Sequence, residues 1–348
     1  LDAARRRGDA GRPSGDLTLL LPHVDGDPVA VRLAGRWQLQ PARENITALA
    51  NSPETPNEMF MAAVESLAAM GGAASGATLQ RIAADDASLP RRMAAAAALA
   101  ALDLPLAAGL AAEILTAKSL ARESADDLFN ALLDRRDGPQ ALANNLADRK
   151  IPKTTAARGA QLASAHGGDV QDLIKVLIKA GGLEPLTQQL DTDQMRALID
   201  EIRKQGDPKR GELIYRREAL GCVKCHALGG KGGRVGPDLM SLGGSAPLDY
   251  IVQSLLEPSA KIKENYHASV IELISGRVLT GVVVQQSDQQ VVLRDAQDKL
   301  VTVRRDEIDQ QTTSSVSMMP AGLMTSLRRD ELIDLVHFLS ELGKTASR

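Results

Sequence analysis

The chain has 348 residues, of which 44% are hydrophobic and 24% are charged, a composition that allows two or three domains with apolar cores of their own. Its formal net charge is −3, so neither a basic nucleic-acid-binding surface nor a polybasic membrane patch is expected, and no apolar run is long enough to span a membrane. Only 2% of the residues are aromatic and alanine supplies much of the apolar share, which favours closely packed helices over an aromatic-rich β-sandwich.

The start of the chain carries no clear structural pattern, and residues 1–16 are expected to be disordered. This basic segment lacks the apolar core of a secretory signal peptide. Because the chain begins at Leu1 without a methionine, we expect a mature or excised fragment whose leader lay upstream. Two helices are then predicted at 28–39 and 43–50, with Trp37 as a core residue rather than a ligand contact.

A helical pattern continues from 57 to 205, interrupted by short Gly, Pro and Asp breaks. The segment 61–70 recurs 32 positions later at 93–102, which is a repeat period of helical hairpins. Further helices are predicted at 125–135, 139–147, 169–180 and 192–205. Residues 1–205 are therefore predicted to form a HEAT-like α-solenoid. It is either a docking surface or, since no exposed aromatic or charged cluster marks a binding face, a rigid spacer.

The most informative motif is Cys222-Val223-Lys224-Cys225-His226, which contains the only two cysteines of the chain. A CxxCH run is typical of covalent c-type haem attachment, in which Cys222 and Cys225 form thioethers and His226 binds the iron. A zinc site would need further ligands, but the other histidines occur singly, and no strand precedes the motif as in a thioredoxin-like dithiol. The motif therefore predicts one covalent haem c.

The segments that flank this motif predict a small helical haem domain over 206–348. Asp207 and Pro208 begin a helix before the motif, and a glycine-rich loop after it reaches Pro237 and Leu239. The Pro237 carbonyl is expected to bond to the free ring nitrogen of His226 and so orient the imidazole. A helix at 247–256 is expected to wall the haem with an apolar face; the cofactor-binding residues predicted besides the thioethers are Pro237, Leu239, Tyr250 and Leu255.

From 266 to about 310 the pattern changes to alternation of apolar and polar residues, which predicts a small β-sheet inserted into the helical domain. Four short strands are predicted, at 269–274, 278–284, 291–293 and 300–303. A final helix is predicted at 329–342, whose His337 packs or faces solvent. The whole chain is thus predicted to be mainly α, a HEAT-like solenoid followed by a cytochrome c-like haem domain with a small inserted sheet.

The turn before the final helix presents two methionines, Met318 and Met319, next to Pro320. A haem iron with His on one side commonly takes Met on the other, which raises its reduction potential. Met319 is the predicted distal ligand and Met318 the second choice, ahead of Met240 and Met324. A methionine can equally fill a core, so this assignment is a hypothesis.

Residues from about 206 to the end resemble the haem-binding domain of the Pirellula/Verrucomicrobium (planctomycete) type, a class I-like cytochrome c module with an inserted β-region. The matching segments are Cys222 to His226, Gly232 to Leu239, Pro258-Ser259 with Ile262 and Tyr266, and Ser317 to Leu323. The resemblance implies an exported electron-transfer domain, often fused to HEAT-like repeats and to dehydrogenase-like propellers. Covalent haem attachment takes place outside the cytoplasm in bacteria, so a periplasmic or otherwise exported location is expected.

The leading functional hypothesis is an electron-transfer cytochrome rather than an enzyme, in which His226 and Met319 are the two axial ligands and leave no open position on the iron. Its expected partner is a redox protein or a fused dehydrogenase domain, with no nucleic acid and no membrane span. One alternative is a haem enzyme or ligand sensor with an open distal position, and another is an interaction scaffold with a tethered haem. Basic residues that either steer an acidic partner or are ordinary solvated charges are Lys224, Lys231, Arg234, Lys261 and Lys263.

Overall fold

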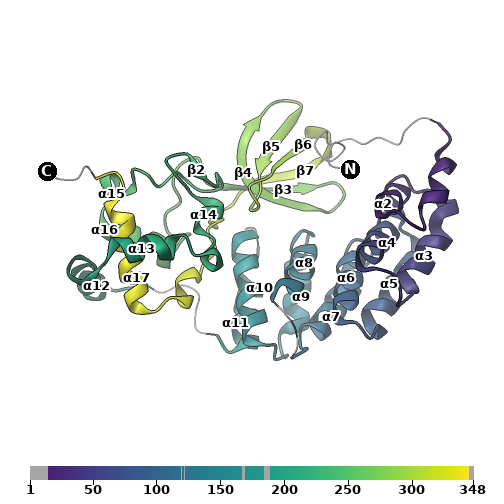
Figure 1. Cartoon of the computed structure of the whole chain (residues 1–348), viewed down its shortest axis with the longest axis horizontal. Coiled ribbons are helices and arrows are strands. Elements are labelled where there is room, and N and C mark those ends of the chain that lie inside the picture. The colour runs from purple at the N-terminus through teal and green to yellow at the C-terminus, as the bar shows by residue number, and fades with distance from the viewer. Residues whose placement is uncertain (1–14, 119, 121, 167–168, 184–188, 345–348) are drawn as a thin grey trace. The chain divides into compact units, whose positions relative to one another are not determined.

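The computed structural model describes residues 15–118, 120, 122–166, 169–183 and 189–344 and is mainly helical with a small antiparallel sheet (Figure 1). The segment expected to be disordered lies almost entirely outside the described residues. The chain divides into two compact units. The first comprises 1–163, 171–183 and 276–278, and the second comprises 164–170, 184–275 and 279–348. No helix in the described ranges is long and apolar enough to cross a membrane.

The first unit consists of helices that follow one another as short antiparallel neighbours (Figure 1). They are η1 (Leu17–His23), α2 (Pro28–Arg36), η2 (Gln40–Ala42), α3 (Arg43–Asn51), α4 (Asn57–Met70), α5 (Gly72–Asp85), α6 (Leu89–Leu99), α7 (Leu104–Ile114), α8 (Arg122–Leu133), α9 (Gly138–Leu146), α10 (Lys153–His166) and α11 (Gln171–Gly181). Contacts link α2, α4, α6 and α8 in one layer and α3, α5, α7, α9 and α11 in another. Each helix therefore buries one face on its hairpin partner and another on the next repeat.

Small apolar side chains allow this close stacking. Val64 and Leu67 of α4 are buried, and the residues 32 positions later, Ala96 and Leu99 of α6, are buried as well. The repeat seen in the sequence thus corresponds to equivalent core positions. Trp37, expected in the core, is half-buried at the C-terminal end of α2. The helix α10 had no counterpart among the predicted elements.

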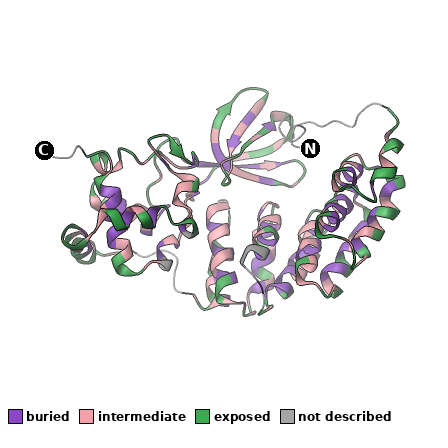
Figure 2. Ribbon diagram, viewed as in Figure 1, coloured by how far each residue is buried: buried purple, intermediate pink, exposed green. Residues whose placement is uncertain are grey.

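The second unit packs short helices around an apolar core (Figure 2). Its helices are α12 (Thr192–Gln205), α13 (Pro208–Tyr215), η3 (Glu218–Leu220), α14 (Cys222–Cys225), α15 (Leu242–Ser245), α16 (Leu248–Leu256), η5 (Leu323–Ser326) and α17 (Arg329–Glu341). The closest crossing joins α13 and α17, where a Cβ on Gly211 would lie 2.6 Å from the Cβ of Phe338. Asp207 caps α13 and Pro208 occupies its first turn, as the sequence indicates.

The division between the units differs from the one expected near residue 205. Leu198 and Ile202 of α12 are buried in the core of the second unit, and α12 contacts α16 and α17. The helix therefore belongs with the second unit rather than with the helical array. Its amphipathic pattern suits either neighbour, so the pattern alone could not assign it.

The inserted sheet has five strands, one more than expected. They are β3 (Ala268–Leu273), β4 (Val278–Gln286), β5 (Gln290–Arg294), β6 (Leu300–Arg304) and β7 (Ile308–Thr313), in the spatial order β6-β5-β4-β3-β7, with η4 (Arg305–Glu307) before the last. The antiparallel register places Val291 opposite Val303 and Ile271 opposite Gln311. The edge strand β7 is mostly polar and therefore has no alternating apolar signal, so the insertion ends at Thr313 rather than near 310. A two-stranded ribbon, β1 (Ala227–Leu228) with β2 (Lys231–Gly232), follows the CxxCH motif.

Candidate functional site

The CxxCH motif folds as the single helical turn α14, followed by His226 in an extended conformation. Gly221 comes just before this turn with a φ of 69°, a left-handed conformation that glycine adopts without a steric penalty. Both cysteines are free and half-buried; Cys222 packs against the main apolar core of the second unit, and Cys225 packs against a smaller apolar cluster beside the sheet. The turn thus holds two thiols and one imidazole within five consecutive residues.

The imidazole of His226 is oriented by the carbonyl of Pro237, which lies 2.9 Å from Nδ1. Because a carbonyl oxygen can only accept, Nδ1 carries the proton of this hydrogen bond. Burial lowers the pKa of His226, and the bond to Pro237 opposes that effect. The ring is therefore neutral at neutral pH, with the lone pair of Nε2 available to a ligand. This is the arrangement found in metal-ligating histidines, whose second nitrogen is fixed by a hydrogen bond.

The glycine-rich loop passes so close to the motif that side chains would not fit there. A Cβ on Gly236 would lie 2.7 Å from Nδ1 of His226 and closer still to the ring carbon between the nitrogens. A Cβ on Gly233 would clash with the carbonyl of Lys224. The N–H of Gly233 donates to Val223 O at 2.9 Å, and the N–H of Gly236 donates to Cys225 O at 2.8 Å. The loop therefore forms a backbone cradle around the imidazole.

Two residues that the sequence did not single out also hold this region. Tyr215, at the end of α13, donates its hydroxyl to His226 O at 3.0 Å, and burial raises the pKa of this phenol to about 12. Asp238 accepts hydrogen bonds from Met240 N at 2.9 Å, Gly230 N at 2.7 Å and Gly229 N at 3.0 Å, which lower the pKa of its carboxyl. Both residues act on backbone groups, and only the short spacing of Asp238 from the glycines is a signal in the sequence.

The structure separates the four candidate methionines by their surroundings. Met318 is buried among apolar residues beside the sheet, and Met324 is buried in the main core. Met240 is 53% exposed. Met319 is half-buried, in a turn where its N–H donates to Ser317 Oγ at 3.1 Å. Of the four, Met319 is the one that is neither packed into a core cluster nor largely exposed.

Two of the predicted wall residues lie around the core of the second unit. Leu239 and Leu255 are half-buried and pack against the cluster that also contacts Cys222. Tyr250 of α16 is half-buried, with the Lys261 ammonium 5.9 Å from its ring centroid. Leu239 and Leu255 thus share one apolar region of the second unit with Cys222.

The electrostatics of the two thiols differ from those of a redox-active pair. Burial raises the pKa of both thiols, that of Cys222 to about 11, whereas a reactive dithiol needs a lowered pKa. Across the described ranges, no group of three or more His, Cys, Asp or Glu side chains is placed to hold a metal ion.

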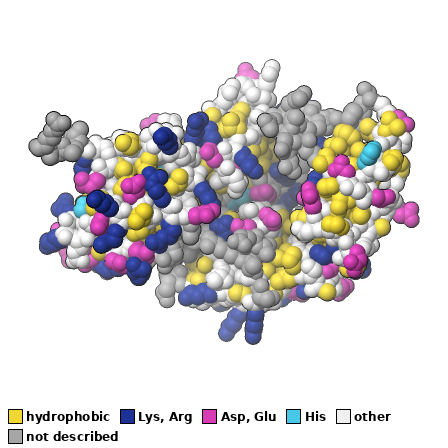
Figure 3. Space-filling view, viewed as in Figure 1, with side chains coloured by type: hydrophobic (Ala, Val, Ile, Leu, Met, Phe, Trp, Pro, Cys, Tyr) yellow, Lys and Arg dark blue, Asp and Glu magenta, His cyan; other side chains and the backbone are white. Residues whose placement is uncertain are grey.

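Basic side chains are visible over much of the face of the second unit that Figure 3 shows. Several arginines of this unit form ion pairs with carboxylates. The paired atoms are Arg217 Nη2 and Glu331 Oε1 at 2.7 Å, Arg329 Nε and Glu201 Oε2 at 2.9 Å, and Arg210 Nε and Asp334 Oδ2 at 2.7 Å. In the motif, Lys224 Nζ lies 3.7 Å from Glu218 Oε1. The other basic residues singled out in the sequence are all exposed: Lys231, Arg234, Lys261 and Lys263. The latter four remain candidates for contact with an acidic partner.

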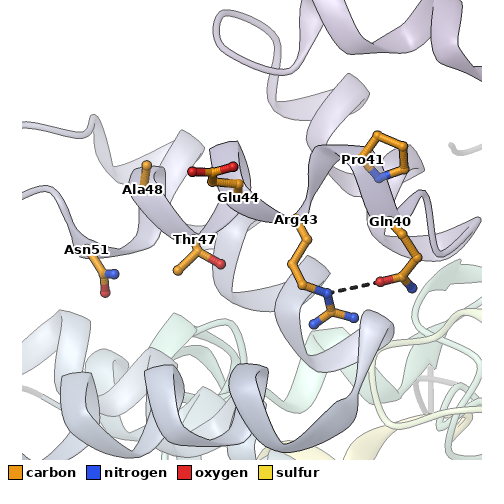
Figure 4. Close-up of a pocket in the computed structure, with 7 residues that line it drawn as sticks. All are labelled: Gln40, Pro41, Arg43, Glu44, Thr47, Ala48 and Asn51. Carbon is orange, nitrogen blue, oxygen red and sulfur yellow. Dashed lines mark hydrogen bonds between the residues drawn. The ribbon is translucent and has the colours of Figure 1, made fainter.

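A hollow lined by residues of η2 and α3 is the other notable surface feature (Figure 4). It is lined by Gln40, Pro41, Arg43, Glu44, Thr47, Ala48 and Asn51. Arg43 donates hydrogen bonds from Nε to Gln40 Oε1 at 3.1 Å and from Nη1 to Gly71 O at 3.0 Å. It thereby satisfies a backbone carbonyl just after α4. Its role there is structural.

Comparison with protein-family models and with curated proteins finds no match for this chain.

Proposed function

We propose that this chain is a c-type cytochrome that binds one haem covalently and transfers electrons. The observation that carries the proposal is His226, which follows two free cysteines and has Nδ1 bound to Pro237 O at 2.9 Å. That bond presents Nε2 as the ligand nitrogen. The cradle at Gly236 leaves the ring without a competing side chain on that side.

The donor set fits a haem c. Cys222 and Cys225 would anchor the group through thioethers, His226 would bind its iron and Met319 would close the opposite side. Leu239, Tyr250 and Leu255 would supply an apolar wall that excludes water. When bound, the group exchanges one electron at a time. Tyr215, Pro237 and Asp238 hold the backbone and the imidazole in place while this happens.

The same proposal extends to the folds of the two units. We infer that the second unit is a class I-like cytochrome c module of the Pirellula/Verrucomicrobium type, because α13 and α17 cross closely and flank the motif, with a sheet between α16 and the methionine turn. The two layers of paired helices in the first unit support a HEAT-like array that acts as a rigid spacer. A redox protein or a dehydrogenase domain, outside the cytoplasm, is the proposed electron partner.

Haem attachment is tested by producing the chain in a bacterium with c-type cytochrome maturation. The wild type should retain haem after denaturing electrophoresis, and Cys222→Ala with Cys225→Ala should lose it completely. Met240→Ala, at an exposed methionine near the same loop, is the matched control and should retain haem. A wild type that carries no covalent haem would rule the proposal out.

Axial ligation is tested on the same haem-loaded protein. The ferric wild type should show the near-infrared methionine-to-iron charge-transfer band, and Met319→Ala should abolish it and lower the reduction potential. Met240→Ala should leave both unchanged. A wild type that lacks the band and binds carbon monoxide readily would instead indicate an open distal position and a sensor or enzyme.

A further inference from the structure

A small apolar cluster joins the CxxCH motif, the glycine-rich loop, the methionine turn and the inserted sheet. Its buried members are Val235, Ala268, Val282 and Met318, and Cys225 packs against them. We call this set the bracket cluster. Ala268 belongs to β3 and Val282 to β4, so the sheet supplies two of its five residues.

The other three members each directly precede a residue of the proposed haem site. Cys225 precedes His226, Val235 precedes Gly236 of the cradle, and Met318 precedes Met319. A single packing unit therefore contacts the segments that carry both proposed axial ligands. A displacement of the sheet would change the positions of both segments together, because close-packed side chains transmit such shifts.

Hydrogen bonds from backbone N–H groups also hold the glycine-rich loop and the methionine turn to the sheet and to the loop that precedes it. Ser314 N, at the start of the methionine turn, donates to Ala268 O of β3 at 2.8 Å. Arg234 N, in the glycine-rich loop, donates to Asp298 Oδ2 in the turn between β5 and β6 at 3.3 Å. Ser317 N donates to Ser259 Oγ at 3.1 Å. The sheet thus has a separate anchor on the proximal loop and on the distal turn.

We propose that the inserted sheet is a bracket that positions the two axial ligand segments, and that Met318 is its anchor on the distal side rather than an alternative ligand. This inference rests on the proposed haem function. Because the bracket holds the turn next to Met319, it would keep Met319 on the iron of a bound haem and so exclude small exogenous ligands. Val282 and Met318 are accordingly positioning residues.

The haem-loaded full chain tests the bracket through imidazole binding to the ferric protein, since imidazole competes with the distal methionine. Val282→Ala should tighten the apparent imidazole affinity by about three- to tenfold and weaken the methionine-to-iron band, because loss of two buried methyl groups loosens the closed arrangement. Val303→Ala is the matched control: Val303 is also buried but lies in the sheet's own core. It should change the imidazole affinity by less than about twofold while lowering stability to a similar extent.

Met318 gives a second, independent pair of variants. Met318→Leu keeps an apolar side chain of similar volume and should retain the band and the imidazole affinity, whereas Met318→Ala should weaken the band. Loss of the band in Met318→Leu would show that Met318 is the ligand and would overturn its role as an anchor. This pair also decides the question if Val282→Ala does not accumulate.

The outcomes separate the two proposals. If the wild type takes up haem but Val282→Ala and Val303→Ala affect imidazole binding equally, the bracket is wrong and the cytochrome assignment stands. If the wild type takes up no haem, both are wrong. Only a ligand-binding effect confined to the bracket cluster supports the positioning role.

Discussion

The two compact units stabilise their helices by different means. In the first unit, the buried helix positions are largely alanines and leucines repeated along the array, such as Ala63, Leu67, Ala96 and Leu99. Contacts with particular backbone groups occur in both units, but in the second unit such contacts hold the motif itself, as Tyr215 does at His226 O. Repeated small side chains distribute the stability of the first unit over many similar contacts. The orientation of one imidazole in the second unit depends instead on a few contacts that no other residue can replace.

The chain carries a separate optical probe for each unit, which makes this difference measurable. The only tryptophan, Trp37, lies in the first unit, and all three tyrosines, Tyr215, Tyr250 and Tyr266, lie in the second. Denaturant titrations followed by tryptophan fluorescence and by near-ultraviolet tyrosine circular dichroism therefore report the two units separately. Separate probes are needed because a chain of two units need not unfold in one step.

The largest expected effect comes from Gly211→Ala in α13. The new Cβ would lie 2.6 Å from the Cβ of Phe338 and would clash with the carbonyl of Asp334, so α13 and α17 must separate. We expect the free energy of unfolding of the second unit to fall by about 3 kcal/mol. The tyrosine signal should report this loss, and the tryptophan signal should not.

Gly76→Ala in α5 is the matched substitution in the first unit. No atom lies within 4 Å of a Cβ built at Gly76, so alanine should raise the stability of this unit by about 0.5–1 kcal/mol through its higher helix propensity. If both substitutions destabilise their units by similar amounts, the loss at Gly211 does not come from the close approach of α13 to α17.

A smaller effect is expected at Asp334, a buried carboxylate of α17. Its carboxylate accepts hydrogen bonds from Asp207 N at 2.8 Å and from Arg210 Nε at 2.7 Å. These two bonds connect the start of α13 to α17. Asp334→Asn should lower the stability of the second unit by about 2 kcal/mol at neutral pH. The matched change Asp172→Asn removes an exposed pair with Lys175 in the first unit and should cost at most about 0.5 kcal/mol.

The pH dependence of this pair has a defined sign. The hydrogen bond from Arg210 lowers the pKa of Asp334 below its ordinary value, although burial opposes it. A carboxyl with a depressed folded-state pKa stabilises the fold above its unfolded pKa, about 4, and loses this contribution as the pH falls through the folded value. The difference between the wild type and Asp334→Asn should therefore shrink below about pH 4. A difference that grows in acid would contradict the assigned pairing.

Much of the fold could be predicted because its elements have periodic patterns. Apolar periodicity indicated the helices of the array, and alternation indicated β3 to β6. The exceptions are elements whose burial depends on distant neighbours. The helix α10 has a weak pattern, with Thr155 and Ser164 among its buried residues, and β7 is a polar edge strand. The helix α10 and the strand β7 form because of the elements that they pack against, and not because of a pattern in their own sequences.

The candidate site shows the same division. Cys222, Cys225, His226 and Pro237 could be named from the sequence because CxxCH and the following Gly-Pro segment are local signals. The contact of Tyr215 could not, since it is made with a backbone carbonyl, which carries no residue-specific signature. The preference for Met319 over Met318 comes from the sequence, whereas the burial of Met318 against the sheet depends on distant neighbours that the sequence does not indicate.

The smallest expected effect, and the most specific, comes from Tyr215→Phe. The ring would keep its packing on Phe338, with centroids 5.7 Å apart, and lose only the hydrogen bond to His226 O. Stability of the second unit should fall by about 1 kcal/mol, whereas Tyr266→Phe, whose hydroxyl has no hydrogen-bond partner among the described residues, should have almost no effect. Because the folded-state pKa of Tyr215 is raised to about 12, the unfolded chain loses the phenol proton first, and the advantage of the wild type should decline above about pH 10. An effect that is independent of pH up to 12 would show that burial does not raise the pKa of this phenol, whereas equal stability of the wild type and Tyr215→Phe at neutral pH would show that the hydroxyl does not hold the backbone of His226.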